Sequence, residues 1–231
     1  MSFHVSTATL FVDPQCPFAW ITYRWLRLVE DSGAVDLDVQ LMSLACVNEH
    51  QELDPGHRAY NEDAWAAGRV GAALLASPHA ARWPAFYDTF GRRRHVDGVR
   101  DNLANIAASL RDLDLPADLG RAAADRAWDA DLRARTTLAV TGVDGPGGTP
   151  ITRIGARAYF GPVLTSVPPA DEAVDLWRSL SRLSAISGFA SIATRRDDHL
   201  DTGSRTAPRP LTAKAHEAAS VSSVSTAGSH P

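Results

Sequence analysis

Residues 7–44 have the pattern of a strand, a helix and a second strand, with a cysteine where the first strand passes into the helix. Thr7 to Asp13 is rich in apolar residues, Pro17 to Ser32 has helical spacing, and Val35 to Leu44 alternates between polar and apolar residues. A helix that joins two strands of one sheet leaves them parallel, and the crossover is right-handed. We therefore expect Cys16 at the sheet edge where both strands end.

The position of Cys16 predicts a reactive thiol. It directly precedes Pro17, and proline suits the first position of a helix. The backbone N–H groups and the positive end of a helix stabilise an anion there, and such sites lower a cysteine pKa from about 8.5 to roughly 3.5–7.5. We expect Cys16 to be substantially ionised at neutral pH. A Cys-x-x-Cys pair would have its second thiol at Ala19, so the Cys-Pro-Phe-Ala motif is a single-thiol site.

The middle of the chain is helical in pattern, and strands return towards its end. Apolar residues keep helical spacing from residue 57 to about 142, and one long helix is expected over Pro116–Val140. Strand character returns at Pro150–Ile154 and Ala158–Phe160, before a last helix over Ala170–Ser187. The element order is therefore βαβ, helices, ββα.

This order predicts an α/β fold with a discontinuous domain. Residues 1–55 and 143–193 form the βαβ and ββα halves of that domain, and residues 56–142 form an all-helical insertion between them. Residues 194–231 are rich in Ser, Thr, Ala, Arg and Pro with little periodicity, so we expect a disordered tail there.

Composition excludes several classes of function. The chain has 231 residues, 45% of them hydrophobic, which is enough for a real core. Its formal net charge of −4 argues against nucleic-acid binding, which usually needs a basic face. Met1 to Val12 lacks a signal-peptide pattern and no apolar run approaches ~20 residues, so we expect a cytoplasmic protein away from membranes. The eight histidines are dispersed, and none pairs with a cysteine at zinc-like spacing, so no metal is predicted.

Four segments carry a resemblance to a known family. The segments are Phe11 to Thr22 around Cys-Pro, Met42 to Ala45 with Asn48-Glu49, Gly148-Thr149-Pro150, and Tyr159 to Leu164. Together they resemble the actinobacterial mycothiol-dependent reductases, including the nitroreductase type, within the DsbA-like branch of the thioredoxin superfamily. The similarity spans roughly Leu10 to Ile186.

The resemblance implies a thioredoxin-like fold of DsbA type and a set of site residues. The family motif is Cys-Pro-Trp-Cys, whose first cysteine is the nucleophile; here Phe18 replaces the tryptophan and Ala19 the second cysteine. No tightly bound cofactor is implied. The implied partners are a mycothiol-like small thiol as co-reductant, a small electrophilic or disulfide substrate and, in a homodimer, a second copy of the chain. The implied site is Cys16 as nucleophile, Pro17, Phe18 and Trp20 beside it, and Thr149 before a cis Pro150 that faces the thiol.

Two other functions remain open at this point. One is thiol transfer or isomerisation as in the kappa-class glutathione transferases, where the helix start activates a bound small thiol and no second cysteine is needed. The other is a non-catalytic module that binds peptides beside Pro150, with Cys16 as a structural residue at the helix start. A cysteine pKa near 8.5 would favour the module.

Three further positions have competing interpretations. Cys46 follows the second strand, so it could be a displaced resolving thiol, although filling an apolar position is favoured. Asp13 could act on the proton of the thiol, but an aspartate before proline favours a turn. The basic run Arg92 to His95 could bind an anionic group of a small thiol or substrate, but a solvated helix end is favoured.

Overall fold

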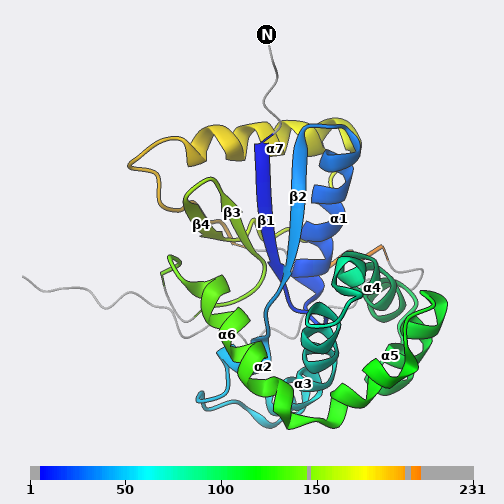
Figure 1. Cartoon of the computed structure of the whole chain (residues 1–231). Helices are drawn as coiled ribbons and strands as arrows, with labels where there is room; N and C mark the ends of the chain where they lie inside the picture. Colours follow the sequence, from blue (N-terminus) through cyan, green and yellow to red (C-terminus); the bar gives the residue numbers. More distant parts are fainter. Residues whose placement is uncertain (1–5, 145–146, 196–198, 204–231) are drawn as a thin grey trace, which may run out of the picture.

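A four-stranded sheet is the centre of the protein, for which a computed structural model describes residues 6–144, 147–195 and 199–203 (Figure 1). The strand order is β2–β1–β3–β4; β1 and β2 are parallel, and the other neighbouring pairs are antiparallel. The strands are β1 (Ser6–Val12), β2 (Val35–Leu41), β3 (Ile151–Ile154) and β4 (Arg157–Phe160).

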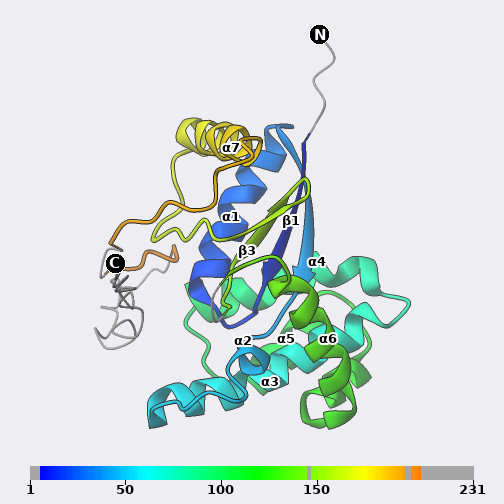
Figure 2. The ribbon, with the colours of Figure 1, turned by 90° about the vertical axis from the view of Figure 1, so that its left-hand side faces the viewer.

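Helices cover both faces of this sheet, with α1 and α6 on opposite sides (Figure 2). On one face α1 packs against α7, where Trp25 Nε1 donates a hydrogen bond of 2.9 Å to the carbonyl oxygen of Ala173. On the other face Phe11 and Ile151 pack against Ala139 of α6. The α-helices are α1 (Pro17–Asp31), α2 (Leu44–Val47), α3 (Pro55–Leu75), α4 (Trp83–Gly91), α5 (Asn102–Asp112), α6 (Asp129–Val140) and α7 (Ala170–Ser184).

Every element between β2 and β3 is helical in the described residues, as expected from the spacing of apolar residues. The helices α3, α4 and α5 gather beyond the carboxyl ends of β1 and β2, and α7 crosses the opposite end of the sheet (Figure 1). The insertion therefore lies next to the start of α1. Its short helices are the 3₁₀ segments η1 (Ala80–Arg82), η3 (Ala117–Ala124) and η4 (Arg126–Trp128) and the π-helical turn η2 (Arg92–Val96).

The βαβ and ββα halves are confirmed, but the expected helix over Pro116–Val140 is wrong. Only its second part, α6, is α-helical. Asp125 has an extended backbone (φ −92°, ψ 108°), and its side chain accepts a hydrogen bond from the N–H of Ala127. Aspartate favours such a cap over a helix interior, so a new helical segment begins there.

Part of the C-terminal segment contacts the domain, and the expected disorder from residue 194 onward stays a prediction. The Thr202 hydroxyl donates to the carbonyl oxygen of His95 over 2.7 Å, and Arg24 donates to the carbonyl oxygen of Thr202. The rest of the expected tail, residues 204–231, lies outside the described residues. Within the described ranges, none of the helices combines the length and the apolar character that a bilayer span requires.

Candidate active site

Cys16 caps the N-terminus of α1. After β1 ends, a turn is closed by a 3.0 Å hydrogen bond from the N–H of Cys16 to the carbonyl oxygen of Asp13. The extended backbone of Cys16 and Pro17 at the first helical position then start the helix. The N–H of Ala19 donates to Cys16 Sγ over 3.5 Å, in the place where a capping oxygen usually accepts. A helix-end N–H aimed at sulfur favours the thiolate over the thiol.

The loop before β3 meets this thiol. The peptide bond between Thr149 and Pro150 is cis, as the family resemblance implied. Cys16 Sγ lies 3.6 Å from the carbonyl oxygen of Thr149, to which the protonated thiol donates. Thr149 is itself held because its hydroxyl donates to the carbonyl oxygen of Phe11 in β1. The fold thus brings together two segments that are 133 residues apart in the chain.

The other expected site residues differ in exposure. Pro17 and Phe18 are partly exposed, whereas Cys16 itself is only 4% exposed. Trp20 is buried at 2% and its ring stacks on that of His95, with ring centres 5.8 Å apart. Pro17 and Phe18 are therefore the partly exposed residues that directly follow Cys16, whereas Trp20 belongs to the core.

The basic run after α4 is not a solvated helix end throughout. Arg92 and Arg93 do form ion pairs near the surface, but Arg94 and His95 are 5% and 9% exposed. Arg94 Nη2 donates to Gln15 Oε1 over 2.7 Å. His95 Nε2 lies 3.2 Å from the carbonyl oxygen of Pro14, a contact that requires the proton on Nε2. Sequence reasoning missed both side chains because their π-helical turn departs from ordinary helical spacing.

Asp13 is a buried turn residue. Its carboxylate accepts hydrogen bonds of 2.7 Å from the N–H groups of Gln15 and Leu44, so the first bond closes the expected turn and the second joins it to α2. Burial raises the pKa of Asp13 from 3.8 to about 6, although both N–H groups and the charge of Arg94 act to lower it. The carboxylate thus links the segments that follow the two parallel strands.

Cys46 lies in α2 and is half-buried. Burial raises the pKa of its thiol from 9.0 to about 11, partly opposed by a hydrogen bond with Thr136. It lines a cavity of about 300 Å³ together with Arg133, Thr136 and Val140. Both thiols are reduced in the structure. Cys46 is thus a poor nucleophile at neutral pH, and a resolving role for it stays a prediction.

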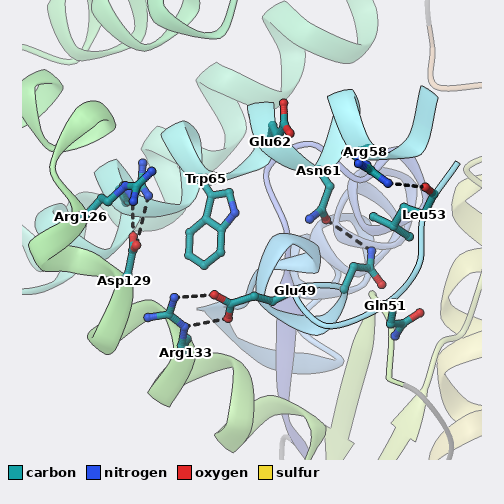
Figure 3. Close-up of a pocket in the computed structure, with 12 residues that line it drawn as sticks. Glu49, Gln51, Leu53, Arg58, Asn61, Glu62, Trp65, Arg126, Asp129 and Arg133 are labelled. Atoms are coloured by element: carbon teal, nitrogen blue, oxygen red, sulfur yellow. Dashed lines mark hydrogen bonds and ion pairs between the residues drawn. The ribbon is translucent and has the colours of Figure 1, made fainter. Parts of the chain in front are cut away.

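A second, larger cavity of about 630 Å³ is lined by the loop after α2, by α3 and by α6 (Figure 3). The guanidinium groups of Arg69 and Arg133 both lie over the Trp65 ring, with their central carbons 5.2 and 5.3 Å from the ring centre. Arg69 pairs with Asp129, and Arg133 donates two hydrogen bonds to Glu49. Each of these cations has its own carboxylate. One pair joins α3 to α6 within the insertion, and the other joins α6 to the loop after α2.

Solved structures of other proteins share this fold. A 2-hydroxychromene-2-carboxylate isomerase matches with a TM-score of 0.54 and 13% identity, over 77% of this chain and 96% of its own. The cytosolic disulfide reductase DsbM from Pseudomonas aeruginosa, solved with GSH, matches with a TM-score of 0.51 and 14% identity, over 76% of this chain and 99% of its own. The α/β, thioredoxin-like fold of DsbA type is confirmed.

Sequence comparisons identify the family. Protein Rv2286c of Mycobacterium tuberculosis is 28% identical over 194 residues, which are 81% of this chain and 79% of that protein. The family model described as Rv2466c-like, mycothiol-dependent nitroreductase Rv2466c, matches residues 15–194. That match includes Cys16 at the start of α1 and the Thr149-Pro150 loop that faces it. The chain therefore belongs to the Rv2466c-like family of mycothiol-dependent nitroreductases.

Proposed function

We propose that this protein is a cytoplasmic thiol-dependent oxidoreductase in which Cys16 is the single nucleophile. The observation that carries this proposal is the placement of Cys16 Sγ, 3.5 Å from the N–H of Ala19 and 3.6 Å from the carbonyl oxygen of Thr149. The first contact stabilises a thiolate. The second lies on a loop whose backbone can pair with an extended partner, as in strand addition.

The proposed cycle uses two exchange steps. The Cys16 thiolate attacks one sulfur of a substrate disulfide, forms a mixed disulfide and releases the other sulfur as a thiolate, which takes a proton from water. A small thiol, as its thiolate, then attacks the substrate sulfur of the mixed disulfide. This releases the Cys16 thiolate, and the substrate leaves as a disulfide with the small thiol. The electrons come from the small thiol and the substrate disulfide accepts them.

The proposed cycle needs an external thiol because residue 19 is an alanine. In a Cys-x-x-Cys site the second thiol would attack the mixed disulfide from within, and alanine has no sulfur to do so. The family supports mycothiol or a similar low-molecular-weight thiol as that co-substrate. Such a thiol pool is kept reduced in the cytoplasm, which supports the proposed location. The 4% exposure of Cys16 favours small or extended substrates over broad protein surfaces.

Thiol transfer or isomerisation is the second candidate. Its support is the match to 2-hydroxychromene-2-carboxylate isomerase, at a TM-score of 0.54. In such a reaction the start of α1 would activate the sulfur of a bound small thiol, and Cys16 would form no covalent bond. A binding module without turnover is the third candidate and needs no reactive thiol at all.

Replacement of Cys16 by Ser separates these candidates. We expect Cys16→Ser to lose thiol-dependent reduction of a small disulfide, because a serine hydroxyl is hardly ionised at neutral pH, while its circular dichroism stays unchanged. Cys46→Ala is the matched control and should retain activity. Intact mass after exposure to oxidised mycothiol or glutathione should show one adduct, on Cys16. Full activity of Cys16→Ser would move the assignment to transfer with a bound thiol.

A further inference from the structure

The turn that precedes Cys16 is held by two consecutive side chains of the helical insertion. Arg94 reaches the side chain of Gln15 and His95 reaches the carbonyl oxygen of Pro14, over 2.7 and 3.2 Å. Both come from the π-helical turn η2, which directs neighbouring side chains into the protein. These contacts join residues 79 and 81 positions apart in the chain.

Gln15 is fixed by more than one partner. Its side-chain oxygen accepts from Arg94, its carbonyl oxygen accepts from the Tyr60 hydroxyl over 2.5 Å, and its N–H donates to the carboxylate of Asp13. Gln15 is 1% exposed and directly precedes Cys16. A rotation of its backbone would therefore move the sulfur relative to the start of α1.

Arg94 is a buried cation with a specific set of partners. Its Nη1 donates to Asn102 Oδ1 over 2.8 Å, and its guanidinium lies over the ring of Tyr60, 5.9 Å from the ring centre. The charged or titratable groups that face it are Asp13, Tyr60, Asp63 and Arg100. A guanidinium with several fixed N–H directions can hold Gln15 and Asn102 at the same time, which a lysine ammonium cannot do as rigidly.

We propose that Arg94 is a positioning residue that holds Gln15 and thereby sets Cys16 Sγ against the N–H of Ala19. The proposal rests on the proposed nucleophilic function of Cys16. Without the guanidinium, Gln15 Oε1 and Asn102 Oδ1 lose a charged donor and the turn relaxes. The contact between the N–H of Ala19 and sulfur then loosens, and the thiolate loses part of its stabilisation.

The test is the alkylation rate of Cys16 by iodoacetamide as a function of pH, measured on the full chain. Arg94→Met removes the donors and keeps an unbranched chain, and Arg92→Met removes a charge from the same turn at an exposed site. We expect the apparent pKa of Cys16 to rise by about one unit in Arg94→Met, equivalent to a tenfold change in thiolate stability. Arg92→Met should match the wild type. Arg94→Lys should lie between Arg94→Met and the wild type.

The outcomes distinguish this proposal from the function on which it rests. A wild-type Cys16 with the pKa of an ordinary thiol contradicts the proposed function itself. If the wild-type pKa of Cys16 is low, and Arg94→Met and Arg92→Met give the same Cys16 pKa, only the role of Arg94 is contradicted. If Arg94→Met does not fold, Gln15→Ala replaces it, because this change removes the same contact and leaves the cation with Asn102. An unchanged Cys16 pKa in folded Gln15→Ala overturns the proposal.

Discussion

The N–H of Ala19 donates to the sulfur of Cys16 across 3.5 Å, so residue 19 lies one helical turn from the thiol. We therefore expect Ala19→Cys to form an internal disulfide with Cys16 under mild oxidation, because such pairs bridge when their Cα atoms are about 4.4–6.8 Å apart. Intact mass should show the loss of two hydrogens, and the variant should reduce disulfides without a small thiol in the resolving step. Ala19→Ser is the control of similar size and should show neither change. Persistence of two titratable thiols near the helix start would mean that the local geometry does not allow the bridge.

The thiol of Cys46 should react far more slowly than the thiol of Cys16. With a pKa of about 11, only on the order of one Cys46 in a thousand is a thiolate at pH 8. In folded Cys16→Ser, iodoacetamide should therefore label Cys46 slowly, and denaturation should raise the rate strongly. Mild oxidation of the wild type should give no loss of two hydrogens. A bridged species in the wild type that is absent in Cys46→Ala would instead establish Cys46 as a resolving thiol.

His95 should make the fold sensitive to acid. Burial, and then the charge of Arg94, lower the pKa of His95 from 6.5 to about 3. Below pH 6.5 the unfolded chain therefore binds a proton that the folded protein does not, and the free energy of unfolding falls as the pH falls towards 3. The full decrease in the free energy of unfolding is about 5 kcal/mol. Urea unfolding should show the difference between wild type and His95→Gln shrinking as the pH is lowered through this range.

Asp13 opposes this trend over part of the same range. Its folded pKa of about 6 lies above its ordinary value of 3.8, so its contribution favours folding as the pH falls from 6 to 3.8. The free energy of unfolding of the wild type should therefore change less with pH over this range than that of Asp13→Asn, which keeps the effect of His95 alone.

His79→Gln changes an exposed histidine and is the matched control for His95→Gln. A pH-independent difference between wild type and His95→Gln would show that His95 is not buried as a neutral ring.

The ion pair between Arg69 and Asp129 should stabilise the insertion measurably. Both side chains are only 13% exposed, and two hydrogen bonds of 2.6 and 3.2 Å join them. Asp129→Asn should lower the free energy of unfolding by roughly 1.5–3 kcal/mol, the range for hydrogen bonds to charged groups. Asp118→Asn breaks a pair whose side chains are 79% and 84% exposed and should cost less than about 1 kcal/mol. If urea unfolding shows the same loss of free energy of unfolding in Asp129→Asn and Asp118→Asn, the pair between Arg69 and Asp129 is no stronger than an ordinary surface pair.

Local patterns in the sequence determined the elements and the candidate nucleophile. The strand before Cys16, Pro17 at the first helical position and the alternation after Gly33 each depend on neighbours within a few residues. The resemblance around Gly148-Thr149-Pro150 then identified the loop that faces the thiol. These signals are readable because backbone propensity and capping act within one or two turns.

Only the tertiary structure decided what surrounds the thiol. Arg94 and His95 look like ordinary surface charges in the sequence, and the π-helical turn buries them against Gln15 and Pro14. The raised pKa of Asp13 likewise depends on burial beneath α2, which composition does not encode. The physical reason is the same in each case: burial, and the hydrogen bonds that offset its cost, are set by groups from other elements of the chain that meet only in the folded structure.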